Sequence, residues 1–141
     1  MRHALLLILA LGCAPPDPID VSGSTGVEIR VLYPEPELNL RLDEDGMLRT
    51  LVVVDMIGLE FLPPGTTSDV QLGIGHYHLF VQETQYITSP SSLAYELETD
   101  AFRAGQRGII NVDLRENNHD VFEEDGCDCT ASVEFNVLAT E

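Results

Sequence analysis

Two histidines separated by one residue are the side chains best suited to chemistry in this sequence. His76 and His78 flank Tyr77 in an apolar stretch, and residues two apart on a β-strand point to the same face. Imidazole nitrogens are good ligands for copper and zinc, so this spacing predicts a transition-metal site. Gly73 and Gly75 precede the pair and predict a close backbone approach or a bulge, a feature often found beside functional sites. The alternative is that both imidazoles are structural and only hydrogen-bond to a neighbouring loop.

Further candidate ligands lie towards the C-terminus. His119 lies just after a predicted strand and is the expected third metal ligand, while Cys127 and Cys129 lie a few residues further along in an acidic loop. Thiolates bind Cu(I) or zinc, whereas in an oxidising compartment the same two cysteines form a disulfide. The sequence leaves both alternatives open for the cysteines.

The elements that must position these residues are predicted to be strands. Apolar and polar residues alternate with a period of two, and Pro, Gly and Asp residues separate the runs. The expected strands lie within residues 27–33, 48–61, 70–81, 93–98, 110–115 and 133–138. In the histidine strand, Tyr77, Leu79 and Val81 share the face opposite His76 and His78. No segment has a helical period, so we expect an all-β protein, an antiparallel immunoglobulin-like β-sandwich of about seven strands.

The N-terminus predicts the cellular location. Residues 1–3, Met-Arg-His, give the chain a short basic start. Residues 4–11 form an apolar run, and Gly12 and Cys13 follow. This is the layout of a secretory signal peptide. The run is shorter than the roughly 20 residues of a membrane-spanning helix. Residues 9–13 resemble a bacterial lipobox, which implies a signal peptide over 1–12 and lipidation of Cys13. The alternative is an ordinary signal peptide that happens to contain a cysteine.

The mature chain is expected to be a tethered single domain. Residues 13–26 are rich in Pro, Ser, Gly and Asp, as in a flexible tether, and residues 27–141 form the β-sandwich domain. Ala14 follows the lipidation site, and in the Gram-negative lipoproteins that this segment resembles, a residue other than Asp there permits transport to the outer membrane. We therefore expect a lipid-anchored protein of the bacterial cell envelope, at the outer membrane and facing the periplasm or the outside.

Composition and motifs exclude several functions. The chain has 141 residues, a net charge of −17 and no lysine, so nucleic acid is not an expected partner. Its sequence contains no GxSxG, P-loop or HExxH motif, and the expected protein is not an enzyme.

The string GHYHLFV, residues 75–81, resembles the GHHHLLI-type signature of a family of small secreted bacterial envelope domains of unknown function. In that family a Gly-containing turn, an apolar strand and a histidine follow, which correspond here to 105–106, 109–114 and His119. Tyr77 replaces the middle histidine, and the Cys127–Cys129 element is not part of the family pattern. The resemblance implies a fold and an envelope location but no activity.

Two functions from different classes follow. The first is a lipid-anchored envelope protein that binds copper or zinc through His76, His78 and His119. The alternative is a non-catalytic structural or protein-interaction lipoprotein without a metal site, whose acidic face or sheet edge recruits another envelope component. Replacing His76 and His78 with Ala distinguishes the two.

Overall fold

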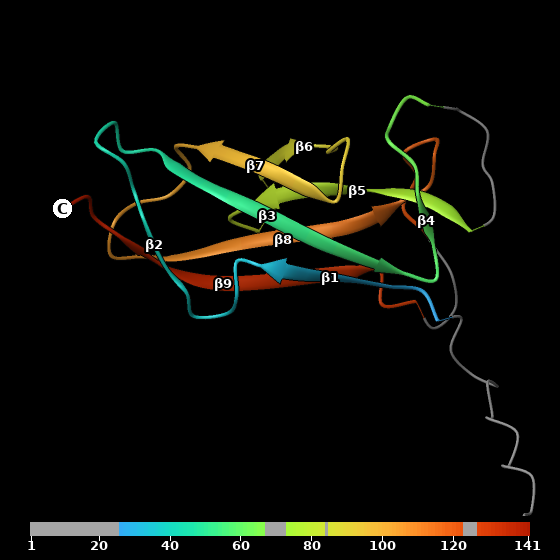
Figure 1. The fold of residues 1–141 in the computed structure, drawn as a ribbon, viewed down its shortest axis with the longest axis horizontal. Helices are drawn as coiled ribbons and strands as arrows, with labels where there is room; N and C mark the ends of the chain where they lie inside the picture. The colour runs from blue at the N-terminus through green and yellow to red at the C-terminus, as the bar shows by residue number, and fades with distance from the viewer. Residues whose placement is uncertain (1–25, 67–72, 84, 123–126) are drawn as a thin grey trace, which may run out of the picture.

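The computed structural model describes residues 26–66, 73–83, 85–122 and 127–141, and these form an all-β protein (Figure 1). The strands are β1 Glu28–Tyr33, β2 Asn39–Arg41, β3 Leu48–Ile57, β4 Glu60–Phe61, β5 Ile74–Val81, β6 Gln85–Thr88, β7 Ala94–Thr99, β8 Arg107–Arg115 and β9 Thr130–Leu138. The described residues contain no helix that is long and apolar enough to cross a membrane. The expected signal peptide, the lipidation site Cys13, Ala14 and the tether up to residue 25 lie outside the described residues.

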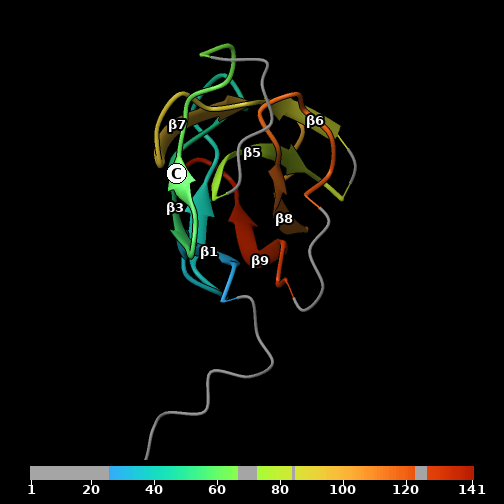
Figure 2. The same cartoon turned by 90° about the vertical axis from the view of Figure 1, so that its right-hand side faces the viewer.

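Two sheets face each other and confirm the predicted β-sandwich. One sheet has the strand order β1-β3-β7, and the other has the order β2-β9-β8-β5-β4, with β6 paired to β5. Figure 2 shows the first layer beside the second when the molecule is viewed along its long axis. The immunoglobulin-like assignment is finer than this arrangement and stays a prediction.

The core lies between the sheets and follows the period-two pattern of the sequence. Alternate residues of each long strand point inwards, and most of them are completely buried. The buried apolar side chains include Ile29, Leu48, Val52, Tyr77, Leu79, Val81, Leu97, Ile110, Val112, Leu114, Phe135 and Val137. Burial of such side chains contributes roughly 1.5–3 kcal/mol each, so the sandwich holds β5 and β8 firmly in place.

The structure departs from the predicted antiparallel arrangement at two short strands. β2 pairs with β9, and β4 pairs with β5, and both pairs are parallel. β2 and β6 are absent from the predicted strands because they are three and four residues long. Such short segments carry too little alternation to be recognised from sequence.

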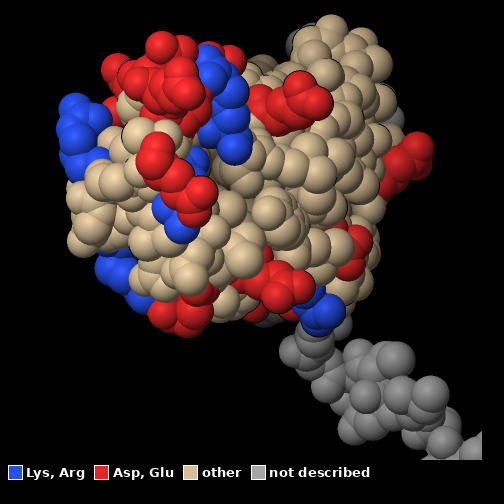
Figure 3. Space-filling model, turned by 60° about the vertical axis from the view of Figure 1, so that its left-hand side comes forward, with Lys and Arg blue, Asp and Glu red and all other residues tan. Residues whose placement is uncertain are grey.

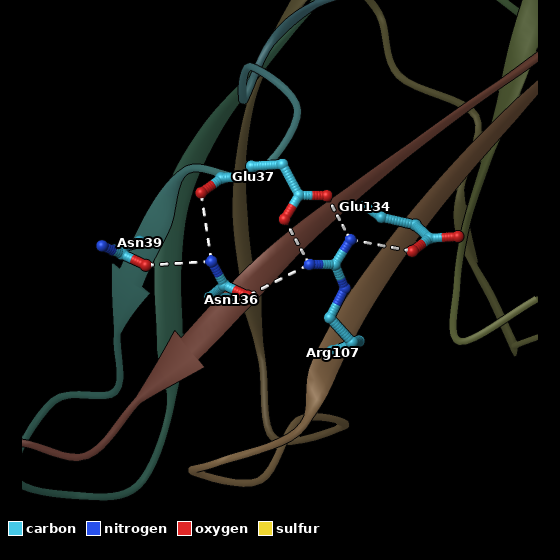
Figure 4. Close-up of polar contacts among 5 residues, drawn as sticks. All are labelled: Glu37, Asn39, Arg107, Glu134 and Asn136. Carbon is cyan, nitrogen blue, oxygen red and sulfur yellow. Dashed lines mark hydrogen bonds and ion pairs between the residues drawn. The ribbon is translucent and has the colours of Figure 1, made fainter.

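A polar cluster at one end of the molecule explains where β2 lies (Figure 4). The Arg107 guanidinium on β8 donates hydrogen bonds to Glu37 and to Glu134. The Asn136 side-chain amide on β9 donates to the Glu37 carbonyl oxygen at 3.1 Å and to Asn39 Oδ1 at 3.0 Å. These contacts join the β2 segment to β8 and β9 through side chains far apart in sequence.

The arginines of the described residues are individually paired and do not form a cluster. Ion pairs join Arg30 to Glu28, Arg41 to Glu141, Arg49 to Asp43 and Glu98, Arg107 to Glu37 and Glu134, and Arg115 to Asp113. Arg103 donates to the backbone carbonyls of Asp100 and Phe102. On the face drawn in Figure 3, arginine side chains lie beside acidic ones. Most of these pairs are exposed, so each contributes little stability.

Candidate metal centre

The β5 strand presents both sequence-predicted histidines on its outer face. Tyr77, Leu79 and Val81 are 0% exposed and anchor the inner face, and the Tyr77 hydroxyl donates to the Ser92 carbonyl oxygen at 2.9 Å. Because neighbouring residues of a strand alternate between faces, His76 and His78 point the other way. Their ring centroids lie 5.3 Å apart.

His119 reaches the same place from a tight turn after β8. The Glu116 amide donates to the Asp120 carbonyl at 3.0 Å, and the His119 amide donates to the Glu116 carbonyl at 2.9 Å. The Asn118 side-chain oxygen accepts a hydrogen bond from the Asp120 amide at 3.0 Å. His119 has a φ of 70°, a left-handed conformation in which Asn, Asp and His are enriched among non-glycine residues. The turn therefore suits its sequence and directs the imidazole back over β5.

The three imidazoles converge on one point. His119 Nδ1 lies 3.2 Å from His76 Nε2 and 3.1 Å from His78 Nε2. All three ligand nitrogens lie within 4.8 Å of one another. Two nitrogens that each lie about 2.0–2.1 Å from a zinc ion are separated by about 2.9–3.4 Å, so the two distances from His119 Nδ1 suit a shared metal ion. Without a metal, one Nδ1 proton can serve only one of the two neighbouring Nε2 atoms at a time.

Burial differs along the cluster. His76 is fully buried, His78 is half-buried and His119 is exposed. The pKa of His76 is lowered from 6.5 to about 4, chiefly by burial and in addition by the neighbouring His119, His78 and Arg115. Burial also lowers the pKa of His78, with Arg115 adding to the effect and Asp113 opposing it. Both strand imidazoles are therefore neutral at pH 7, which is the form that binds metal.

Residues of β8 border the site, and sequence reasoning missed them. β5 and β8 are antiparallel, with His76 opposite Arg115 and His78 opposite Asp113. Arg115 Nη2 donates to Asp113 Oδ2 at 2.5 Å. The alternation of 110–115 places Asp113 and Arg115 on the outer face, but only the strand register reveals that they lie against the histidines.

Gly75 fulfils the predicted close backbone approach. A Cβ atom at this position would lie 2.8 Å from the Arg115 carbonyl oxygen and 3.7 Å from Leu59 Cδ1. Any side chain would therefore push β5 away from the end of β8. Gly73 lies just before the strand with a φ of 78°. Gly73 therefore allows the left-handed conformation before β5, and Gly75 allows the strand to pack against the end of β8 directly beside His76.

The cysteines form a disulfide and are not in the histidine cluster. Cys127 and Cys129 are bonded, with their Cα atoms 5.2 Å apart. Asp128 between them makes two hydrogen bonds at the start of β1, from its amide to the Val27 carbonyl at 3.1 Å and from the Ile29 amide to its carbonyl at 3.0 Å. The candidate ligand group found among the described residues consists of His76, His78 and His119. Of the alternatives open for the cysteines, the structure has the disulfide.

Fold and site together define an all-β sandwich with a cluster of three histidines that can hold a metal ion. The sequence matches no protein-family model and no curated protein. The resemblance of residues 75–81 to the GHHHLLI-type signature therefore stays a prediction.

Proposed function

We propose that this protein binds one copper or zinc ion through His76 Nε2, His78 Nε2 and His119 Nδ1. The observation that carries the proposal is the convergence of the three nitrogens, with His119 Nδ1 at 3.2 and 3.1 Å from the other two. Two of the ligands are held on a core strand and the third on a hydrogen-bonded turn, so the donor set is prearranged. Prearranged ligands reduce the ordering cost of binding.

The donor set favours copper or zinc over other ions. It consists of imidazole nitrogens alone, whereas calcium and magnesium prefer oxygen ligands. The cysteines of the described residues are bonded to each other in a disulfide. They therefore offer no thiolate ligands that would favour Cu(I). The proposed role is metal handling and not catalysis, in line with the lack of catalytic motifs in the sequence.

A metal titration tests the proposal. The full chain carrying Cys13→Ser is titrated with Zn(II) and Cu(II) by calorimetry, alongside His76→Ala/His78→Ala. We expect one-to-one binding that weakens at least about 100-fold in the double variant, because two of three ligands are lost. Glu96→Gln, an exposed carboxylate on the other sheet, is the matched control for binding to the acidic surface and is expected to bind like the parent.

Equal weak binding by all three proteins would refute the metal site. The histidines would then only hold the 116–120 turn against β5, as in the alternative of a structural or protein-interaction lipoprotein. Far-UV circular dichroism of each variant shows whether the sandwich is retained, so that loss of metal is not confused with loss of fold.

We also propose that the protein is a lipid-anchored component of the bacterial cell envelope, attached through Cys13. The basic start, apolar run and Gly12-Cys13 pair support this location. The Cys127–Cys129 disulfide supports an oxidising compartment. Mass spectrometry of the N-terminus of membrane-extracted protein tests the anchor. Cys13→Ala is expected to release the chain from the membrane fraction, whereas Cys127→Ser/Cys129→Ser is expected to stay there, and a Cys13→Ala chain that remains membrane-bound would contradict the proposal.

A further inference from the structure

The three-histidine site leaves part of the metal coordination sphere free of protein. In the described part of the chain, no fourth imidazole, carboxylate or thiolate belongs to the ligand group. Structural zinc sites have four protein ligands, whereas sites with three protein ligands bind water or another small ligand at the remaining position. His119 is exposed and His78 is half-buried, so the free position is accessible to solvent.

An ion pair with unused hydrogen-bonding atoms borders this position. Arg115 lies opposite His76 and Asp113 opposite His78 in the strand register, so their Cβ atoms are roughly 4.5–5.5 Å from those of the histidines. The two side chains are only 18% and 20% exposed. Arg115 Nε and Asp113 Oδ1 are buried and have no hydrogen-bond partner among the described residues. A buried donor without a partner costs free energy, and a ligand that accepts a hydrogen bond from it removes that cost.

A groove adjoins the ion pair at Asp113. It has a volume of about 530 Å³ and runs along the outer face of β5, β8 and β9. Phe80, Glu83, Asn111 and Asp113 line it, whereas the three histidines and Arg115 do not. Asp113 thus belongs both to the groove wall and to the ion pair with Arg115. The groove therefore gives solvent access to Asp113, while the guanidinium and the metal position lie outside its lining.

Charge decides which ligand fits. Three neutral imidazoles leave a divalent ion with its full positive charge, and the Arg115–Asp113 pair adds no net charge. The bound metal would therefore keep its positive charge among ligands and an ion pair that are neutral overall. A small anion neutralises that centre and accepts a charge-assisted hydrogen bond from the guanidinium.

We propose that the metal-loaded site binds a small anion, which ligates the metal at its free position and accepts a hydrogen bond from Arg115. This inference rests on the proposed metal site. Asp113 is a positioning residue here, because its carboxylate holds Nη2 and thereby fixes the guanidinium beside His76.

Cobalt substitution with azide as the probe tests the inference. The full chain carrying Cys13→Ser is loaded with Co(II), the stoichiometry is measured, and azide is titrated while the visible cobalt absorption bands are followed. We expect a saturable spectral change in the parent protein. Arg115→Gln is expected to weaken azide binding at least about tenfold with the Co(II) stoichiometry unchanged. Arg115→Lys, a second variant that keeps the charge but lacks Nε, is expected to weaken it as well.

Arg107→Gln is the matched control, because Arg107 lies at the opposite end of the same strand and its removal is expected to leave azide binding unaltered. Stoichiometric Co(II) binding without any response to azide would overturn the inference and leave the proposed function standing. Equal azide affinity in the parent, Arg115→Gln and Arg115→Lys would overturn it too. Absence of stoichiometric Co(II) binding would instead refute the metal site, and the inference with it.

Discussion

His119 Nδ1 lies 3.2 Å from His76 Nε2, although 43 residues separate the two histidines in the chain. The antiparallel pairing of β5 with β8 produces this contact, because it places Arg115, the last residue of β8, opposite His76. The turn that follows then returns the chain over β5. The site therefore depends on the strand register and on one turn, and each can be tested separately.

The turn can be tested at His119. Asn also adopts the left-handed conformation, so His119→Asn is expected to keep the 116–120 turn while it removes the imidazole. We expect its metal affinity to fall at least about tenfold, with a free energy of unfolding in the absence of metal within about 0.5 kcal/mol of the parent. His119→Val is expected to lose both metal affinity and about 1–3 kcal/mol of stability, because a β-branched residue is strained at a φ of 70°. Calorimetry and urea denaturation measure the two effects, and undiminished metal binding by His119→Asn would contradict the assignment of the third ligand.

The buried imidazole of His76 is expected to make the stability of the metal-free protein depend on pH. Its pKa is about 4 in the folded chain, lowered by burial first and then by His119, His78 and Arg115, and about 6.5 in the unfolded chain. Between these values the unfolded state binds a proton that the folded state does not, so the free energy of unfolding falls as the pH drops from 6.5 towards 4, by at most about 1.4 kcal/mol per pH unit. The contribution is fully present above pH 6.5.

Urea denaturation at several pH values, with a chelator present, measures this dependence. His76→Leu removes the titrating group while it keeps an apolar side chain in the buried position, so the difference between the two proteins isolates His76 from the many carboxylates. We expect the variant to have the shallower slope between pH 6.5 and 4. Identical slopes would show that His76 is not protected from protons in the folded state.

The disulfide is expected to be dispensable for metal binding. Cys127–Cys129 closes a loop with one residue between the cysteines, and so short a loop gains little from the entropy of the unfolded chain. Cys127→Ser/Cys129→Ser is expected to lose about 1–2 kcal/mol of stability, because the 127–129 segment also joins β1 to the other sheet through Val27 and Ile29. Its zinc affinity is expected to match that of the parent. Loss of zinc binding in a variant that remains folded would mean that the cysteines contribute to the metal site after all.

The strands and the histidine face could be predicted because both follow from a local pattern. Alternation fixes which residues of β5 face the core, and the inner set Tyr77, Leu79 and Val81 is buried as expected. His119 was predicted as a candidate ligand, but its approach to His76 and His78 was not. No local pattern gives the path of a turn over a distant strand. Asp113 and Arg115 could not be assigned to the site, since alternation fixes their face but only the β5–β8 register decides which residues lie opposite the histidines.

The close packing of Gly75 against β8 gives the strictest test of the register. Gly75→Ala places a methyl group 2.8 Å from the Arg115 carbonyl, so β5 must move away from β8 beside His76, and we expect a loss of about 1–3 kcal/mol of stability. Gly108→Ala meets a comparable obstacle, the Phe135 ring at 2.4 Å, but at the start of β8, far along the strand from Arg115. Both variants are therefore expected to be destabilised, whereas zinc affinity is expected to fall at least about tenfold in Gly75→Ala alone. Calorimetry on the folded variants, checked by circular dichroism, compares the two affinities. Equal zinc affinity in both variants would mean that the site tolerates displacement of β5 and that its three nitrogens are not held in place by the packing of this strand.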